Sequence, residues 1–326
     1  MKRILITGGA GYIGSVLTPY LIEKGYKVTV FDLMIYGEKV LRKNPNLKII
    51  KGDIRDQSLL RSILPGHNAV IHLACISNDP SFELDPGLGK SINFDAFEPL
   101  VDISSKSGIE RFIYASSSSV YGVKNEKNVH ENMMLHPLTD YSKFKVDCEK
   151  ILLKYDKNNF TTVICRPATV CGYSPRQRLD LVVNILTNLA FHTRKIKIFG
   201  GSQLRPNIHI KDMAEAYLTL LREKKEKVDK RIFNVGFENN TVENLAKTVK
   251  EVIGEDVQLI KEPSNDNRSY HISSKKIEEE LGFKTEFTVK DAVYDLKKTF
   301  EKKLFTQPLI NEDYFNVKKM QSINLK

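Results

Sequence analysis

The sequence predicts an α/β protein in which a doubly wound parallel sheet is followed by a smaller C-terminal α/β domain. Over the first half of the chain, short apolar runs alternate with amphipathic segments, which indicates βαβ units and therefore parallel strands. The apolar runs are nearly continuous, as expected for strands that helices cover on both faces. In addition, the stretch TGGAGYIGS (7–15) places four glycines where the first strand should turn into the first helix.

Seven strands are expected in the parallel sheet. Six of them have the sequences ILIT (4–7), VTVF (28–31), KII (48–50), AVIHL (69–73), RFIYA (111–115) and TVICR (162–166). The run RIFNVG (231–236) has the same character and is predicted to join them. Amphipathic segments at 12–25 and 142–155 are predicted helices. The N-terminal MKRILITGG has too short an apolar run for a secretory signal and is expected to be a strand.

The alternation of strands and helices loosens after residue 170, and this sets the expected domain boundaries. The stretch RPATVCGYSPRQRL (166–179) contains prolines and arginines and is predicted to be a long functional loop. The expected division is 1–170 completed by 207–240 for the sheet domain, 171–206 and 241–304 for the smaller domain, and 305–326 for a tail whose weak patterning predicts no structure.

Composition and charge exclude several classes of protein. The chain has 326 residues, of which 41% are hydrophobic and 28% charged, and no run approaches the ~18 apolar residues of a membrane-spanning helix. Its four cysteines are scattered, so neither a metal site nor a disulfide framework is expected, and a reducing cytoplasm fits best. The net charge of +10 comes from dispersed lysines, which we interpret as solvated helix faces and not as a nucleic-acid surface.

The glycines of the first turn predict a dinucleotide-binding site. Three of them are spaced three residues apart between a strand and a helix, where bare backbone lets a pyrophosphate approach the helix N-terminus. Asp32 ends the second strand, where a carboxylate accepts both ribose hydroxyls and repels a 2′-phosphate, so NAD is favoured over NADP. The predicted cofactor contacts in the turn are Gly8, Gly11, Tyr12, Ile13 and Gly14.

Two further strand ends add candidate cofactor contacts. KGDIRD (51–56) follows the third strand and places Asp53 where it could hydrogen-bond the adenine, although a simple turn carboxylate is the alternative. HLACIS (72–77) ends the fourth strand at the edge where ligands bind in such sheets. The contacts predicted here are Asp53, Ile54, Leu73 and Ala74.

A tyrosine and a lysine predict an acid–base site. Tyr141 and Lys145 are four residues apart and share one face of a helix. The ordinary pKa of tyrosine is about 10, and a neighbouring ammonium and an oxidised nicotinamide would both stabilise its phenolate as a general base. A hydroxyl from the serine run of YASSSSVYG (114–122) could hydrogen-bond the reacting oxygen.

In combination, these motifs resemble the extended short-chain dehydrogenase/reductases, specifically the NAD-dependent nucleotide-sugar epimerase/dehydratase family. TGGAGYIG, Asp32, GDIRD, HLAC, SSSSVYG, YSKFK and RPATVCG occur in the family's order, and the resemblance runs from residue 3 to about 300. It implies a Rossmann-type fold with a nucleotide-sugar-binding second domain. It also implies Tyr141 as catalytic base and acid, Lys145 as its tuning partner on the nicotinamide ribose, and Ser117 as the catalytic hydroxyl. Family members usually dimerise through helices that correspond to about 90–107 and 140–156, although the apolar stripe of the second helix could equally be core.

The residues before Val120 bear on the reaction. Dehydratases and decarboxylases of the family resemble one another in carrying Glu, often Asp-Glu, where this chain has Ser118 and Ser119. Elimination of water needs an acid and a base there, and serine is poor at both. The resemblance therefore favours an NAD-dependent epimerase, which oxidises sugar C4 to a 4-keto intermediate and re-reduces it. A 4-dehydrogenase or ketoreductase is the alternative, whereas a 4,6-dehydratase is disfavoured by these serines and a non-catalytic NAD-binding protein by the retained Tyr141 and Lys145.

Some of the residues that bind the substrate can be predicted from the sequence. GSQLRPNIHIKD (201–212) resembles a family segment that places Arg205 at the nucleotide diphosphate, and NDNRSY (265–270) places Arg268 nearby. Arginine suits phosphate through its planar fork of donors, although ordinary salt bridging is the alternative for both. Cys171 stands where many relatives have tyrosine, which implies a different wall near the cofactor, and SNDPSFELDP (77–86) is unlike the better-known epimerases. The resemblance therefore does not favour interconversion of UDP-glucose and UDP-galactose, and a less common sugar is at least an equal alternative. The predicted substrate contacts are Asn78, Ser117, Ser118, Arg178, Arg205 and Arg268, with Arg176 a further candidate.

Overall fold

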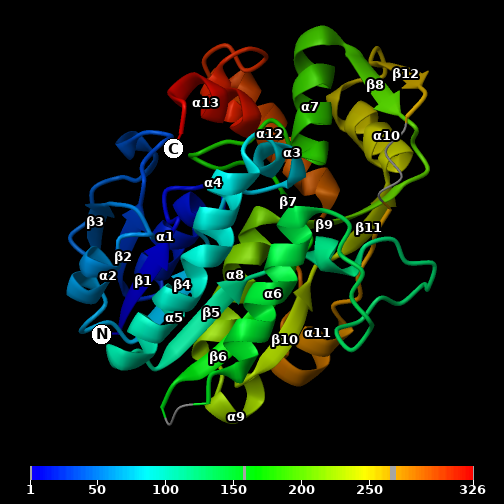
Figure 1. The fold of residues 1–326 in the computed structure, drawn as a ribbon. Helices are drawn as coiled ribbons and strands as arrows, with labels where there is room; N and C mark the ends of the chain where they lie inside the picture. The colour runs from blue at the N-terminus through cyan, green and yellow to red at the C-terminus, as the bar shows by residue number, and fades with distance from the viewer. Residues whose placement is uncertain (1, 157–158, 265–268, 326) are drawn as a thin grey trace.

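The computed structural model describes residues 2–156, 159–264 and 269–325, and its main element is a seven-stranded parallel sheet (Figure 1). The strand order is β10-β6-β5-β4-β1-β2-β3. The predicted doubly wound, Rossmann-type α/β fold is therefore confirmed, including the late seventh strand. The strands are β1 Arg3–Thr7, β2 Lys27–Asp32, β3 Leu47–Lys51, β4 Ala69–His72, β5 Arg111–Ala115, β6 Thr161–Pro167 and β10 Arg231–Val235.

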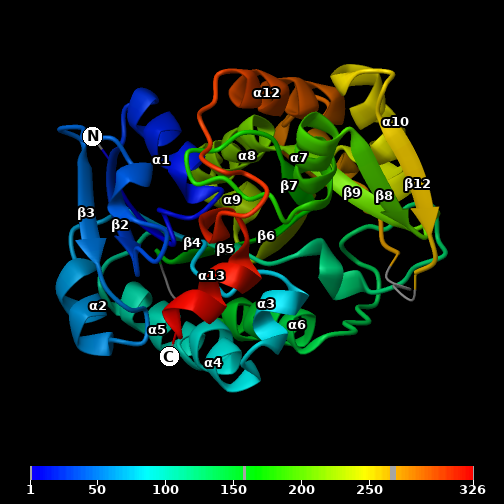
Figure 2. The same cartoon turned by 90° about the horizontal axis from the view of Figure 1, so that it is seen from above.

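Helices cover both faces of this sheet, as the view from above shows (Figure 2). Because side chains alternate along a strand, Ile4 and Ile6 of β1 enter one apolar cluster and Leu5 enters the other. The apolar stripe of the predicted helix at 140–156 belongs to the second cluster, where Cys148 and Leu152 are fully buried. One face is covered by α1 (Gly14–Glu23) and α8 (Ile210–Arg222), and the other by α2 (Gln57–Ile63), α5 (Phe97–Lys106) and α6 (Asp140–Lys154).

A smaller part of the chain packs at one side of the large sheet. Its helices α7 (Val182–Thr193), α10 (Val242–Ile253) and α12 (Val289–Glu301) share an apolar cluster with the parallel pair β8 (Lys195–Phe199) and β12 (Gln258–Glu262). A three-stranded sheet contains β7 (Thr169–Cys171), β9 (Leu204–His209) and β11 (Glu238–Thr241). Of the segment 207–240, β10 and α8 therefore belong to the large sheet and its cover, whereas β9 and β11 pair in the small one.

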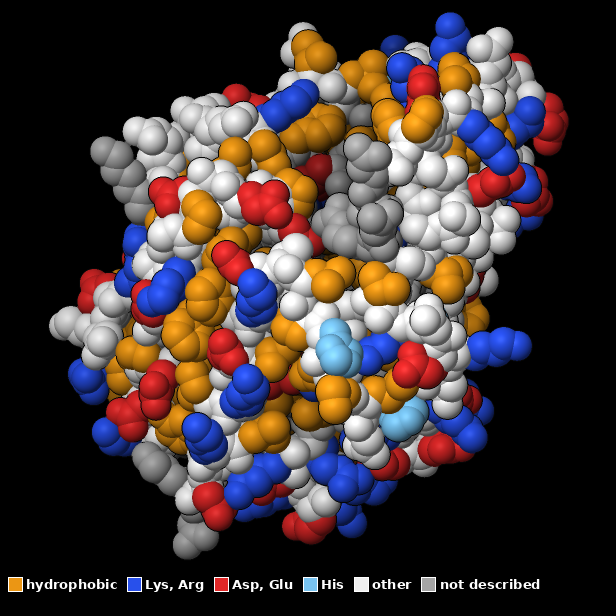
Figure 3. Space-filling view, turned by 45° about the vertical axis from the view of Figure 1, so that its right-hand side comes forward, with side chains coloured by type: hydrophobic (Ala, Val, Ile, Leu, Met, Phe, Trp, Pro, Cys, Tyr) orange, Lys and Arg blue, Asp and Glu red, His pale blue; other side chains and the backbone are white. Residues whose placement is uncertain are grey.

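Short helices complete the fold. They are α3 (Asp79–Glu83), α4 (Pro86–Lys90), a π-helical turn (Ser91–Asp95), α9 (Lys225–Val228), α11 (Lys275–Leu281), α13 (Asn316–Ile323), and 3₁₀ turns at Glu38–Val40, Ser118–Tyr121 and Glu312–Tyr314. The weakly patterned tail, for which the sequence allowed no prediction, thus contains a helix. Within the described residues, no helix is both long and apolar enough to cross a membrane. On the face drawn in Figure 3, basic and acidic side chains are interspersed.

A buried ion pair joins α6 to the sheet. Arg166 of β6 donates from Nη2 to Glu149 Oε2 (2.6 Å) and from Nε to Glu149 Oε1 (2.9 Å), and both side chains are at most 3% exposed. Burial alone lowers the pKa of Arg166, but the hydrogen bonds and charge of Glu149 more than offset this and raise it overall. Ser116 also donates to Glu149, and Arg166 donates to the Tyr121 hydroxyl. The pair therefore binds Ser116, the first of the four serines, through Glu149, and Tyr121, which follows them, through Arg166.

We expect Glu149→Gln to lower the free energy of unfolding by about 3–5 kcal/mol, because it leaves the Arg166 guanidinium buried without a counter-charge. The matched control is Asp147→Asn on the exposed side of the same helix. Asp147 pairs there with Lys150, and its side chain is 42% exposed. Its expected loss is below about 1 kcal/mol. Urea unfolding curves followed by circular dichroism measure both, and equal midpoints for the two variants would show that the buried pair is not a stabilising contact.

Candidate active site

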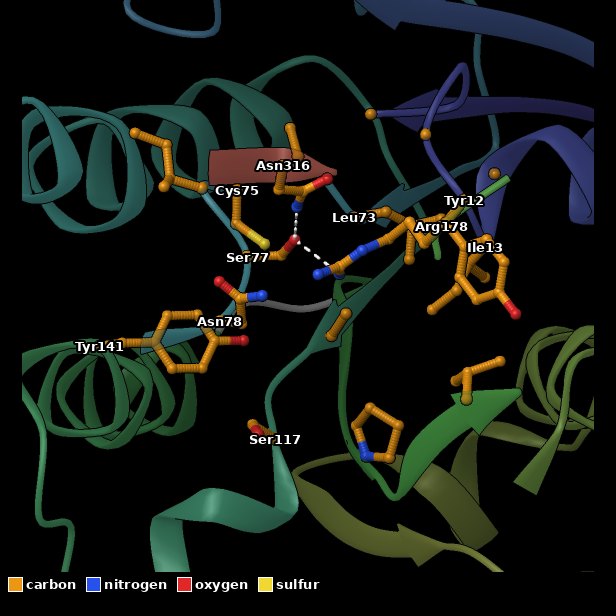
Figure 4. Close-up of a pocket in the computed structure, with 18 of the residues that line it drawn as sticks. Tyr12, Ile13, Leu73, Cys75, Ser77, Asn78, Ser117, Tyr141, Arg178 and Asn316 are labelled. Atoms are coloured by element: carbon orange, nitrogen blue, oxygen red, sulfur yellow. Dashed lines mark hydrogen bonds between the residues drawn. The ribbon is translucent and has the colours of Figure 1, made fainter. Parts of the chain in front are cut away.

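A pocket runs along the carboxyl edge of the large sheet, where ligands bind in folds of this class. Its walls come from the turns that follow β1, β2, β3, β4 and β5, from the start of α6, from the loop after β7 and from the tail. The close-up in Figure 4 shows part of this lining. Of the predicted site residues, the pocket is lined by Gly8, Gly11, Tyr12, Ile13, Gly14, Asp32, Ile54, Leu73, Ala74, Asn78, Ser117, Ser118, Tyr141, Lys145 and Arg178.

The glycine turn brings β1, β4 and α1 into close contact. Gly8 has a φ of +71°, and a Cβ there would lie 2.6 Å from the backbone nitrogen of Ala74. At Gly14, the first residue of α1, a Cβ would lie 2.5 Å from the Cα of Gly9. Side chains at either position would separate the turn from its neighbours. Gly11, Ile13 and Gly14 thereby line the pocket at the N-terminus of α1, where the helix dipole favours a phosphate.

Asp32 is held in place by backbone donors. The N–H of Met34 donates to its Oδ1 (2.7 Å) and the N–H of Ala10 to its Oδ2 (3.0 Å). Burial raises the pKa of this carboxyl, although the two backbone hydrogen bonds act in the opposite direction. Asp32 lines the pocket at the end of β2, so the acceptor expected for the ribose hydroxyls is present and oriented.

Asp53 is engaged by a neighbouring side chain. Both of its carboxylate oxygens accept hydrogen bonds from Arg55, at 2.6 Å for the Nη2–Oδ2 contact. Arg55 holds the pKa of Asp53 below its usual value, even though burial alone would raise it. Gly52 and Ile54 line the pocket on either side of Asp53, which is absent from the described lining. Its contact with adenine stays a prediction.

Tyr141 lies in the first turn of α6, which Thr139 caps by accepting a hydrogen bond from the N–H of Ser142. Lys145 donates from Nζ to the carbonyl of Ala115 (2.7 Å), with Nζ 5.6 Å from the centroid of the Tyr141 ring. Burial raises the pKa of the Tyr141 phenol well above its ordinary value, and Cys75 and Asp79 raise it further. A positive charge placed beside the phenol would lower this pKa.

The serine run faces Tyr141 across the pocket (Figure 4). Ser117 caps the 3₁₀ turn by accepting from the N–H of Ser119 (3.1 Å), and the two hydroxyls share a hydrogen bond of 2.8 Å. Ser118 and Ser119 also line the pocket, so their hydroxyls occupy the two positions where the family resemblance implies acids in a dehydratase. Asn78 lies beside Tyr141 and has a φ of +78°, an uncommon conformation for a residue other than glycine.

The arginines predicted to bind the substrate lie in different places relative to the pocket. Arg178 pairs with Asp180 (Nε–Oδ1 2.8 Å) and donates to Ser77 (3.0 Å), in a position close to Ile13 and the glycine turn (Figure 4). Arg205 stacks over the ring of Tyr270 and is not part of the described lining, although Tyr270 is. Arg268 lies outside the described residues. Arg205 and Arg268 as substrate ligands thus stay predictions.

Part of the pocket wall is not predicted by the sequence. Asn316, Met320 and Leu325 of the tail all line the pocket, and Asn316 contacts Arg176, which lies 140 residues earlier in the chain. The only signal in the sequence is a short apolar spacing in YFNVKKM (314–320), which is too weak to predict a helix.

Comparison with known proteins identifies relatives of more than one activity. A human dTDP-D-glucose 4,6-dehydratase is 29% identical over 333 residues, which cover 92% of this chain and 89% of that protein. The protein y4nG of Sinorhizobium fredii is 34% identical over 218 residues, which are 66% of this chain and 52% of that protein. The crystal structure of UDP-glucose 4-epimerase from Thermotoga maritima with UDP-glucose has a TM-score of 0.83 at 26% identity and covers 93% of this chain and 100% of its own.

The family model described as "NAD dependent epimerase/dehydratase family" matches residues 4–236, which contain the glycine turn, Asp32, the serine run and the Tyr141–Lys145 pair. The pocket also offers what NAD requires, namely an open helix N-terminus and an oriented carboxylate at the end of β2. The chain therefore belongs to the NAD-dependent epimerase/dehydratase family and has NAD as its cofactor.

Proposed function

We propose that the protein is an NAD-dependent nucleotide-sugar 4-epimerase. The observation that carries the proposal is the arrangement of Ser117, Tyr141 and Lys145 around one pocket that also contains the dinucleotide turn. Similarity alone does not choose the reaction, because the relatives include both an epimerase and a dehydratase. The choice rests on the hydroxyls of Ser118 and Ser119, which replace the acid and base that elimination of water requires.

The chain's own residues supply the proton transfers. When bound, NAD accepts a hydride from the sugar carbon and returns it. Tyr141 takes the proton of the sugar hydroxyl during oxidation and gives it back during reduction. Ser117 hydrogen-bonds the same oxygen, and its own hydroxyl is oriented by Ser119 (2.8 Å). Lys145 is fixed by the Ala115 carbonyl close enough to the phenol to stabilise the charge that develops on it.

The nucleotide-sugar end follows from the remaining polar groups. We propose that the smaller part of the chain holds the nucleotide diphosphate through Arg205 and Arg268, since guanidinium forks suit phosphate. Asn78 and Ser118 line the pocket near Tyr141 and are proposed to hydrogen-bond the sugar. We further propose that the enzyme works in the cytoplasm as a homodimer.

The first prediction concerns the reaction outcome. With NAD and a panel of nucleotide sugars, we expect one sugar to be inverted at C4 in NMR spectra while absorbance at 340 nm stays flat, because the hydride returns within one turnover. A sustained rise at 340 nm would mean that reduced cofactor leaves, and it would identify a dehydrogenase. A 4-keto-6-deoxy product would identify a dehydratase.

The second prediction concerns the base. Tyr141→Phe should lower turnover by about 10²–10⁴-fold while leaving NAD binding intact, since only the proton-transfer group is removed. Because burial raises the pKa of Tyr141, the wild-type oxidation half-reaction should also accelerate as pH rises above neutrality. Tyr294→Phe, a change at an exposed tyrosine of α12, is the control. Full activity of Tyr141→Phe would instead support a non-catalytic role for the site.

The third prediction concerns the cofactor. Asp32→Asn should weaken NAD binding by about 10- to 100-fold, because hydrogen bonds to a charged acceptor contribute about 1.5–3 kcal/mol. The same substitution should weaken NADP binding less, so the ratio of the affinity for NAD to the affinity for NADP should fall. Isothermal titration calorimetry measures both, with Asp95→Asn at an exposed surface ion pair as the control. An unchanged preference would show that Asp32 does not contact the adenosine ribose.

A further inference from the structure

The tail crosses the pocket between two apolar anchors. At one end, Phe305 and Tyr314 pack in an aromatic cluster with Phe300, with ring centroids 5.4–5.7 Å apart, and the N–H of Leu179 donates to the Tyr314 carbonyl. At the other end, Met320 of α13 is 8% exposed and belongs to the apolar cluster that the large sheet shares with α2, α5 and α6. In Figure 2, α13 lies over the sheet beside α3 and α4. The tail is thus anchored on both sides of the pocket that it lines.

Asn316 connects the tail to four separate groups. Its N–H donates to Asp180 Oδ2 (2.9 Å) and its Nδ2 to Ser77 Oγ (3.0 Å), while its Oδ1 accepts from Tyr36 (3.0 Å) and from Arg176 Nη2 (2.5 Å). The residue is only 4% exposed. One side chain from the tail therefore holds segments that follow β2, β4 and β7.

Arg176 is a buried cation with unused donor capacity. It is 3% exposed, its guanidinium carbon lies 3.4 Å from the centroid of the Tyr36 ring, and its Nε has no hydrogen-bond partner among the described residues. Burial, together with the nearby Arg178, lowers the pKa of Arg176 to about 10, although Tyr36 and Asp180 act in the opposite direction. Because a buried donor without a partner is costly, this guanidinium is suited to an anionic ligand in the pocket that it lines.

The position of Arg176 identifies that anion. Its backbone N–H donates to Ser15 Oγ (3.2 Å), and Ser174 donates to the Tyr12 carbonyl (2.8 Å), so the loop after β7 is bound to the first turn of α1. That turn is where the pyrophosphate of a dinucleotide binds in this fold. On the adenine side, Met320 and Leu325 pack in one apolar cluster with Ile54 and line the same pocket.

We propose that the tail, residues 305–325, completes the NAD site and retains the cofactor between turnovers. Asn316 positions Arg176 for the dinucleotide pyrophosphate, and Met320 and Leu325 cover the adenine. The tail then prevents bound NAD from exchanging with nucleotide in solution, which suits an enzyme that regenerates its cofactor within each turnover. Only that last point rests on the proposed epimerase function, since retention of NAD is measured without any sugar.

The test is the rate at which NAD leaves the full-length protein. NAD-loaded protein is mixed with excess NADH, and NADH uptake is followed by its fluorescence. We expect Asn316→Ala to release NAD about 10- to 100-fold faster than wild type. Without Asn316, the Arg176 guanidinium is no longer positioned, and its hydrogen bonds to the pyrophosphate are weakened. Gln321→Ala, on the exposed side of α13, should release it at the wild-type rate. Equal rates for all three proteins would overturn the proposal.

A second variant separates the loss of binding from the loss of folding. Arg176→Met keeps an apolar side chain against Tyr36 but lacks the cation, and it should release NAD as fast as Asn316→Ala does. Arg176→Lys should recover part of the retention, since it restores charge without the planar fork. Circular dichroism of each variant shows whether it is folded. If folded Arg176→Met retains NAD as wild type does, then Arg176 does not bind the pyrophosphate and the proposal fails, whatever sugar the enzyme uses.

Discussion

The active-site geometry depends on the buried ion pair between Glu149 and Arg166. Tyr141 and Lys145 lie on α6 and Ser117 lies after β5, so the chemistry needs this helix and this strand end at a fixed separation. The ion pair supplies that constraint, because Glu149 binds Arg166 on β6 and Ser116 beside Ser117. A buried charge pair is a weak source of net stability but is costly to break. In the proposed mechanism it positions Ser117, Tyr141 and Lys145, which must act together on one sugar oxygen.

Electrostatics then link the cofactor to the reaction. Burial keeps the phenol of Tyr141 neutral in the protein alone. In the proposed mechanism, the positive charge of an oxidised nicotinamide bound beside Tyr141 would favour the phenolate, so Tyr141 would act as a base when the oxidised cofactor is present. The same pocket is also lined by the buried arginines Arg176 and Arg178, and the backbone N–H of Arg176 donates to Ser15 in the first turn of α1. In the proposed complex, the charge of Arg176 would complement that of the dinucleotide pyrophosphate.

The sequence predicts those features that local chemistry determines. Seven strands, the glycine turn, Asp32 and the Tyr141–Lys145 pair follow from periodicity and from motifs contained within a few residues. It does not predict the tail, because Asn316 acquires its role only by meeting Ser77 and Arg176, which are 239 and 140 residues away in the chain. Likewise, Arg178 lies against the glycine turn because the loop after β7 folds back onto α1 through Ser174. Contacts of this kind leave no periodic pattern in either segment.

The most direct test of the central claim is the fate of a deuterium placed on C4 of the nucleotide sugar that the enzyme converts. An epimerase that works through Tyr141 and a retained cofactor returns the label to the same carbon. We therefore expect NMR spectra of the inverted product to show deuterium at C4, even with excess unlabelled NADH in solution. Loss of the label to the free cofactor would contradict hydride return within one turnover, and solvent hydrogen appearing at C5 or C6 would indicate elimination of water.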